Sequence, residues 1–163
     1  MPFALLARAL SLSQALVERY TNDLTAPELI QPPFAGGNPP VYILGHLCRG
    51  ERAAHGYLEL LAPSGVDDGF LTQFGRGKVP PTDLAAYGDP RRMLPLFNRL
   101  RDTTLAALPD LTSGHLAKPL APPTALPIFT NLGEALNYVA LHTMAHAGQL
   151  AATRRALGKP SVL

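Results

Sequence analysis

The stretch NLGEALNYVALHTMAHAGQLAATRRALG, residues 131–158, has a helical pattern from one end to the other. Asn131 is a preferred N-cap residue, and Glu134 stands three positions later, where it completes a capping box. Gly158, followed by Pro160, is a strong C-terminal stop signal. We therefore predict one long helix from Asn131 to about Leu157.

Three further stretches show apolar residues at a spacing of three or four, and proline- and glycine-rich zones at 27–40, 63–90 and 109–133 separate them. Asn38 before Pro39, and Asp89 before Pro90, are cap-plus-proline starts. Pro95 lies early in the third stretch, so either its first turn is separate or the helix bends there. The predicted helices cover about 3–22, 39–61 and 89–108.

These four amphipathic helices predict an all-α fold, a four-helix bundle that forms a single domain over residues 1–163. No stretch alternates polar and apolar residues for long enough to indicate a sheet. The connections are long for a minimal bundle. They leave room for a crossover and for loops that cover a site.

The composition of the chain argues against several classes of protein. With 47% apolar and 16% charged residues, the chain is not typical of a disordered protein. Its net charge is +2 and its basic residues are scattered, so no nucleic-acid partner is expected. No apolar run reaches the ~18 to 20 residues that a membrane span needs. The single cysteine, Cys48, fits a reducing compartment, so we expect a cytoplasmic protein.

Two of the five histidines, His142 and His146, lie four residues apart in the last predicted helix. This spacing puts both rings on one face, where they can converge on one metal ion. No carboxylate lies between them, so the pattern is not the HExxH of metalloproteases. The same side carries apolar residues such as Leu141, and the opposite surface should carry Arg154 and Arg155. We therefore expect both imidazoles to face the interior.

A third ligand is expected from another helix, because catalytic sites commonly use three protein ligands and an open position. His46 lies in an apolar stripe of the second helix. His55 lies nine residues later, about 180° around the helix, in the polar segment RAAHGYLE, so His46 is the better candidate. Cys48 is about 200° from His46 and is expected to be a buried, inert thiol. The alternative is a set of hydrogen-bonded core histidines without a metal.

Four residues are candidates for the walls of a pocket. Tyr42 and Tyr138 each lie one turn before a candidate ligand, where core packing is the alternative role. Gln149, one turn after His146, orients a ligand or touches substrate, or else forms a structural bond between helices. Arg49 is placed to meet an anionic substrate carboxylate, although a solvated surface arginine is favoured.

The segments NPPVYILGHLCRGERAAHGYL (38–58) and LGEALNYVALHTMAHAGQLAATRRALG (132–158) resemble the DinB-like superfamily, which includes YfiT-like and S-transferase members. The family motifs read roughly "ilgHl" and "HxxxHxGQi…rr.lG". Here they are ILGHL and HTMAHAGQLAATRRALG. The segment FLTQFGRGKVPPTDLAAY (70–87) is similar to the connecting segment of the family, with less specificity.

The resemblance implies a four-helix bundle in which His46, His142 and His146 hold one divalent metal ion, which is zinc, nickel, iron or manganese in relatives. Characterised members are thiol S-transferases and mycothiol-dependent isomerases. The resemblance therefore implies a metal-dependent transferase that activates a low-molecular-weight thiol for attack on an electrophile, in detoxification or stress response. Its partners would be that thiol and the electrophile, and relatives often form homodimers through bundle faces.

Two alternatives stay open, a metal-dependent hydrolase and a non-catalytic metal-binding or interaction protein. Hydrolysis needs a base near the bound water. Glu51, about 140° from His46, and Glu134, about two turns before His142, lie off the ligand faces. A loop carboxylate could still reach the site, and the candidates are Asp67, Asp68 and Asp83.

Overall fold

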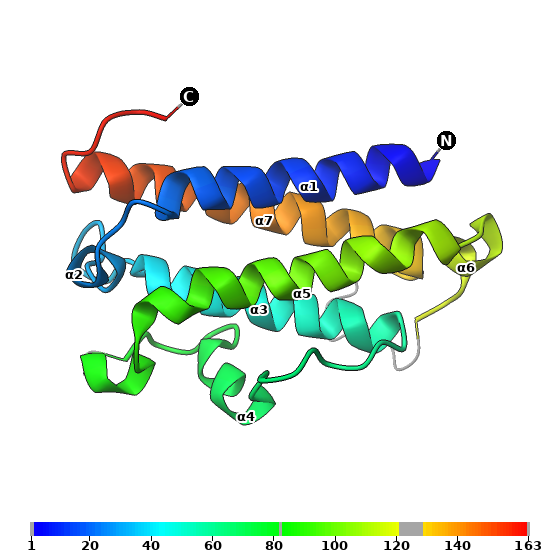
Figure 1. Cartoon of the computed structure of the whole chain (residues 1–163), viewed down its shortest axis with the longest axis horizontal. Helices are drawn as coiled ribbons and strands as arrows, with labels where there is room; N and C mark the ends of the chain where they lie inside the picture. Colours follow the sequence, from blue (N-terminus) through cyan, green and yellow to red (C-terminus); the bar gives the residue numbers. More distant parts are fainter. Residues whose placement is uncertain (1, 82, 121–128, 163) are drawn as a thin grey trace.

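The computed structural model describes residues 2–81, 83–120 and 129–162. In these ranges the chain is helical without a strand, and Pro119 and Asn131 form an isolated β-bridge. The predicted all-α four-helix bundle is confirmed (Figure 1). None of the described helices is long and apolar enough to cross a membrane. The long helices are α1 (Pro2–Thr21), α3 (Pro40–Tyr57), α5 (Met93–Ala107) and α7 (Leu132–Ala156).

Short elements occupy the connections between these helices. They are α2 (Ala26–Leu29), α4 (Asp68–Leu71) and α6 (Ser113–Ala117), with the 3-10 turns η1 (Thr72–Phe74), η2 (Leu84–Tyr87), η3 (Pro90–Arg92) and η4 (Leu108–Asp110).

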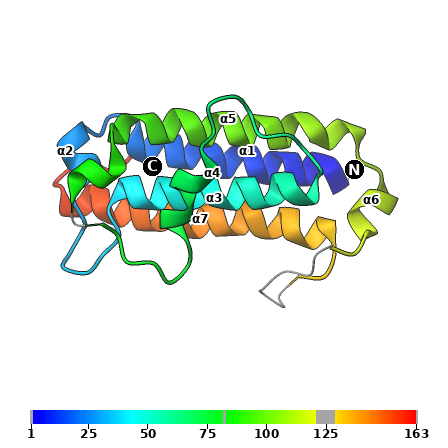
Figure 2. The same ribbon diagram turned by 90° about the horizontal axis from the view of Figure 1, so that it is seen from below.

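The order of the helices explains the long connection between α3 and α5. Helices α1 and α7 run in one direction and α3 and α5 in the other (Figures 1 and 2). Helix α1 packs against α7 and α5, and α3 packs against the same two helices. Because α3 and α5 are parallel neighbours, the chain between them must return along the bundle. This crossover carries α4, η1 and η2, and it is the one that the long connections predicted.

Two of the predicted capping residues, Asn131 and Asp89, cap the elements that follow them. The Asn131 side chain accepts the N–H of Glu134 at 2.9 Å, and the Glu134 carboxylate accepts the N–H of Thr130 at 2.7 Å. Asp89 caps the separate turn η3, and α5 starts after it, with Pro95 in its first turn, where a missing N–H costs nothing.

The second predicted helix was too long at both ends. Its N-cap is Pro39 rather than Asn38, and α3 ends at Tyr57 rather than near residue 61. Glu59 adopts a positive φ of 58°, which a continuing helix does not allow.

A buried polar cluster around Arg101 of α5 lies among the apolar side chains of the core. The guanidinium is 0% exposed and donates to Glu51 at 2.6 and 2.9 Å. It also donates to the Leu10 carbonyl at 2.6 Å, the Ser13 hydroxyl at 3.0 Å and the Thr143 hydroxyl at 2.8 Å. One side chain of α5 therefore bonds to α1, α3 and α7.

Two predicted surface positions are buried. His55 is 0% exposed, and its Nε2–H donates to the Leu100 carbonyl at 2.9 Å. Burial lowers the pKa of His55. The prediction of polar surroundings was wrong because α3 packs against α5 as well as against α7 and the crossover, and His55 lies in the contact with α5. Arg154 is 3% exposed and forms an ion pair with Asp23, which follows α1, whereas Arg155 is exposed as predicted.

Candidate metal centre

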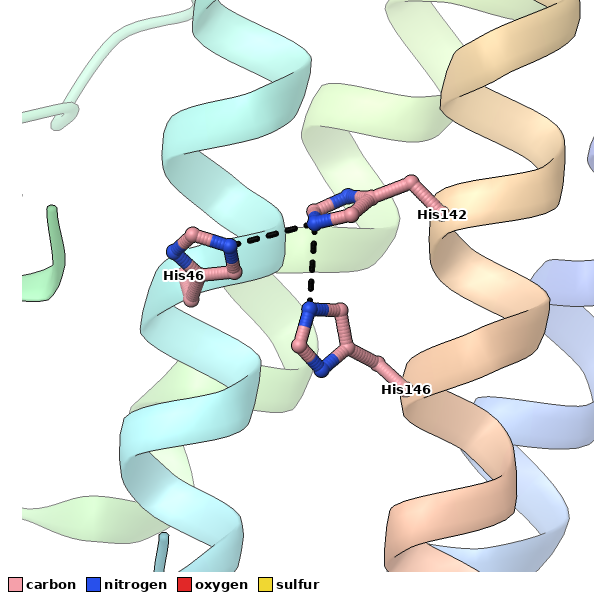
Figure 3. Close-up of side chains that lie close together, drawn as sticks. All are labelled: His46, His142 and His146. Atoms are coloured by element: carbon pink, nitrogen blue, oxygen red, sulfur yellow. Dashed lines mark hydrogen bonds between the residues drawn. The ribbon is translucent and has the colours of Figure 1, made fainter. Parts of the chain in front are cut away.

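The rings of His46, His142 and His146 meet between α3 and α7 (Figure 3). The Nε2 atom of His142 lies 3.1 Å from Nε2 of His46 and 3.0 Å from Nε2 of His146. All three rings are half-buried, and one nitrogen of each lies within 4.8 Å of the others. The structure thus brings together the three histidines predicted from the sequence, in an arrangement that could hold a metal ion.

Two of these rings have their protons fixed on the nitrogen that faces away from the centre. Nδ1 of His46 lies 2.7 Å from the Phe74 carbonyl, and Nδ1 of His146 lies 2.8 Å from Oε1 of Gln149. Because both oxygens can only accept, each Nδ1 must carry the proton. The unprotonated Nε2 atoms of His46 and His146 therefore each direct a lone pair towards the point where the three rings meet.

His142 cannot satisfy both of these lone pairs as an ordinary hydrogen-bonded residue. A neutral imidazole has one proton, and here one Nε2 atom faces two acceptors at 3.1 and 3.0 Å. A cation removes this conflict, because it accepts electron pairs from all three nitrogens. In a tetrahedral site with bonds of about 2.0–2.1 Å, neighbouring nitrogens lie roughly 3.3 Å apart. The donor set and its spacing fit a divalent ion.

The electrostatic surroundings of the two α7 rings favour their neutral form. Burial, with the neighbouring His146 and His46, lowers the pKa of His142 to about 3. Burial also lowers the pKa of His146, against the opposing effect of its hydrogen bond to Gln149. Because a metal binds the neutral imidazole, protons compete for these nitrogens only in acid.

A close packing contact brings the crossover to His46. A Cβ atom on Gly45 would lie 2.4 Å from the Phe74 ring, so only glycine lets this ring pack on α3. Phe74 is fully buried there, and its carbonyl reaches the neighbouring His46. The Tyr42 hydroxyl lies 3.2 Å from the Gly75 carbonyl and 2.9 Å from that of Lys78, a second attachment of the same segment.

The other predicted pocket residues take different roles. The Tyr138 ring stacks on His142, with centroids 5.5 Å apart and an interplanar angle of 17°. Gln149 is exposed, and its Oε1 lies 2.8 Å from Nδ1 of His146 on the same helix, a position from which it can orient that ring. Arg49 is exposed, and Cys48 is fully buried with its Sγ 3.8 Å from the Met93 carbonyl of α5. Burial raises the pKa of the Cys48 thiol, as expected for an inert group.

The surroundings of the two α7 histidines differ from the expected interior face. Leu141 is 60% exposed, and Ala145 and Gln149 are also exposed. The prediction was wrong because α7 carries apolar residues on all sides, so periodicity did not show which side is buried. The rings lie at the border between the core and solvent, where a small molecule can reach them.

A cavity of about 190 Å³ lies beside His46 and His146. Tyr42 lines it, together with Arg76 and Lys78 of the crossover. Of the described residues that form its wall, none has a carboxylate. The two crossover cations were missed at the sequence level, although the alternation of glycine and cations in FGRGK (74–78) is a signal of an exposed basic turn.

The carboxylates considered as bases have other partners. Asp67 accepts the N–H of Phe70 at 2.8 Å, and Asp83 accepts the N–H of Ala85 at 2.9 Å. Asp68 pairs with Arg52 at 2.9 Å. Glu51 is buried against Arg101, and Glu134 caps the start of α7.

Comparisons with known proteins agree with the four-helix bundle fold. The sequence profile of the DinB superfamily matches residues 9–150. No curated protein sequence matches the chain significantly. Among solved structures, YfiT from Bacillus subtilis superposes with a TM-score of 0.67 and 20% sequence identity, over 97% of this chain and 89% of YfiT. YfiT is described as "a probable metal-dependent hydrolase with an unusual four-helix bundle topology". At this identity the likeness concerns the fold alone, whereas the profile match spans most of the chain and shows that the protein belongs to the DinB superfamily.

Proposed function

We propose that the protein is a metal-dependent transferase, in which His46, His142 and His146 hold one divalent ion and a low-molecular-weight thiol attacks an electrophile. The observation that carries this proposal is the set of three convergent imidazole nitrogens beside a cavity whose described lining residues carry no carboxylate. Imidazole ligands suit zinc, nickel and iron, and manganese completes the set to be tested.

The residues around the histidines prepare them for this role. Phe74 and Gln149 hold the ring protons on Nδ1, so that Nε2 of His46 and His146 stays available. Stacking on Tyr138 fixes the plane of the His142 ring. A divalent ion with three protein ligands keeps an open position and lowers the pKa of a thiol or water placed there.

No described residue brings a free carboxylate to the site, which favours a thiol over water as the nucleophile. An ordinary thiol has a pKa of about 8.5, so it needs only a small shift to ionise near neutral pH. Water starts at about 15.7 and usually needs a general base as well. The carboxylates of Asp67, Asp68 and Asp83 are engaged elsewhere, as is that of Glu51.

A metal-dependent hydrolase is the second candidate, and the description of YfiT favours it. In that case the open position would hold water, and the substrate itself or a second water would have to accept the proton. A third candidate is a protein that binds metal without catalysis.

The test compares thiol transfer with hydrolysis on the same metal-loaded samples. Metal-free protein is loaded with zinc, nickel, iron(II) or manganese, and its metal content is measured. Each sample is assayed with glutathione, bacillithiol, mycothiol and coenzyme A against chlorodinitrobenzene, and with p-nitrophenyl esters without thiol.

We expect conjugation of at least one thiol by the wild-type protein and its loss in His142→Ala. His115→Ala, which removes an exposed imidazole of α6, is the matched control and should keep the activity. Ester hydrolysis without any thiol transfer would establish the hydrolase instead. Retained metal with no turnover of either kind would favour the non-catalytic protein.

A further inference from the structure

Three cations lie at the mouth of the candidate metal centre without an acidic partner among the described residues. Arg76 and Lys78 line the cavity beside His46. A Cβ atom on Gly75 would lie 3.5 Å from Cγ of Lys78 and 3.8 Å from Cζ of Arg49, so these two side chains flank the same piece of backbone. All three cations are exposed.

Some other exposed cations are paired with acidic side chains. Arg91 pairs with Asp89 at 2.9 Å, and Lys118 pairs with Glu59 at 3.0 Å. The charge near the histidines has no such compensation within the described part of the chain. A divalent ion held by three neutral imidazoles adds more positive charge at the same place.

The segment that carries these cations is attached directly to the metal-binding side of α3. Its Phe74 carbonyl accepts the Nδ1–H of His46, and its Gly75 and Lys78 carbonyls face the Tyr42 hydroxyl. The same short segment therefore orients one histidine and presents the cations at a set position relative to it.

A neighbouring cavity provides an internal comparison. This cavity, of about 220 Å³, shares Asn38 and Ile43 with the first and extends to Phe34 and Gln149. The described residues that line it are all uncharged. Of these two cavities, the one that contains His46 and His146 carries the positive charge, whereas Arg49 lines a separate cavity together with Arg52 and Asp68.

We propose that the substrate of this site is an anion, with a carboxylate or phosphate group held by Arg76 and Lys78 and with Arg49 at the edge. This inference rests on the proposed function and specifies the thiol: it carries negative charge away from its sulfur. The uncharged neighbouring cavity accommodates the apolar part of the substrate or the electrophile.

The test measures thiol binding rather than turnover, on protein loaded with cobalt(II). Titrations follow the sulfur-to-cobalt charge-transfer absorption with two matched pairs. The first pair, 3-mercaptopropionate and 2-mercaptoethanol, isolates a carboxylate. The second, coenzyme A and pantetheine, isolates phosphate groups. Acetate and inorganic phosphate are titrated separately against the cobalt d–d spectrum.

We expect the anionic member of at least one pair to bind on the order of tenfold more tightly than the neutral member, as two partly exposed ion pairs allow. The preference should shrink at high salt. It should disappear in the double variant Arg76→Gln/Lys78→Gln, which keeps the histidines and should bind cobalt with unchanged stoichiometry. The control, Arg8→Gln/Arg155→Gln, removes two exposed cations elsewhere and should keep the preference.

Equal affinity within both pairs, or an unchanged preference in the double variant, would overturn the proposal and leave thiol transfer standing. If no thiol binds but acetate or phosphate changes the spectrum of the wild-type protein and not of the double variant, the anion site stands and thiol transfer fails. If no probe binds to the cobalt-loaded protein, both proposals fail.

Discussion

Replacing Arg101 by methionine tests whether the buried cluster holds the four helices together. The substitution removes all five hydrogen bonds of the guanidinium. Among the described residues, Glu51, which is 1% exposed, then keeps one bond, from the Thr104 hydroxyl at 2.8 Å. Removing one partner of such a buried pair costs about 3–5 kcal/mol. This is a large part of the roughly 5–15 kcal/mol that stabilises an ordinary domain.

The assay is urea unfolding of the metal-free protein, followed by circular dichroism. Arg99→Met is the matched control, since Arg99 is an exposed arginine of the same helix and its loss should change the free energy of unfolding by only about 0.5 kcal/mol. In the double variant Glu51→Leu/Arg101→Met no charge is left buried alone. We expect it to lose clearly less than the sum of the two single variants.

A loss below about 1 kcal/mol in Arg101→Met, or additive losses in the double variant, would refute this account of the cluster. The cluster also bears on the metal centre, because Arg101 bonds to Thr143, the residue after His142. The folded fraction of Arg101→Met should therefore bind zinc more weakly than the wild-type protein.

Three further predictions follow from the site. Gln149→Ala should weaken zinc binding by about 10- to 100-fold, measured by chelator competition, because His146 loses the acceptor that fixes its proton. Gly45→Ala should lower the free energy of unfolding by about 1–3 kcal/mol in urea, because its Cβ would lie 2.4 Å from Phe74. The metal-free protein should lose stability as the pH falls from 6.5 towards 3. In this window His142, with a folded-state pKa of about 3, stays neutral while the unfolded chain takes up a proton. Above pH 6.5 this group contributes no pH dependence, and unfolding curves at stepped pH values measure the effect.

Each of these three predictions has a control variant on the same helix. Asn137→Ala, at an exposed position of α7, should leave zinc affinity unchanged, and an equal loss there would argue against a specific role of Gln149. Gly56→Ala should not destabilise α3, because a Cβ atom there meets nothing within 4 Å. In His142→Ala the acid loss of stability should be smaller, and an unchanged profile would mean that other groups cause it.

The sequence predicted those features that depend on local chemistry. Caps such as Asn131 and Asp89 mark helix starts wherever the helix packs, and the four-residue spacing puts His142 and His146 on one face in any bundle. His46 was predicted as their partner from its apolar stripe and from the family motif. The homodimer and the cytoplasmic location stay predictions, and size-exclusion chromatography tests the first.

The features that the sequence did not reveal depend on the path of the chain in space. His55 is buried because α5 lies beside α3, and Arg154 because Asp23 turns towards the end of α7. The Phe74 carbonyl and the cations of the crossover reach the site only because parallel α3 and α5 force the chain back along the bundle. Nothing in the spacing of residues 70–80 indicates which helix that segment crosses.

The side-by-side packing of α1 and α7 delays folding during synthesis. The ribosome makes α7 after α3 and α5, so α1 leaves the exit tunnel well before one of its two main neighbours exists. Until then Leu10 and Val17 lack part of their cover, and two of the three histidines have not been made. A prematurely terminated chain therefore exposes apolar surface and lacks two residues of the candidate metal centre. We expect such a chain to be a substrate for chaperones and proteases. The three histidines can meet only after α7 has been made.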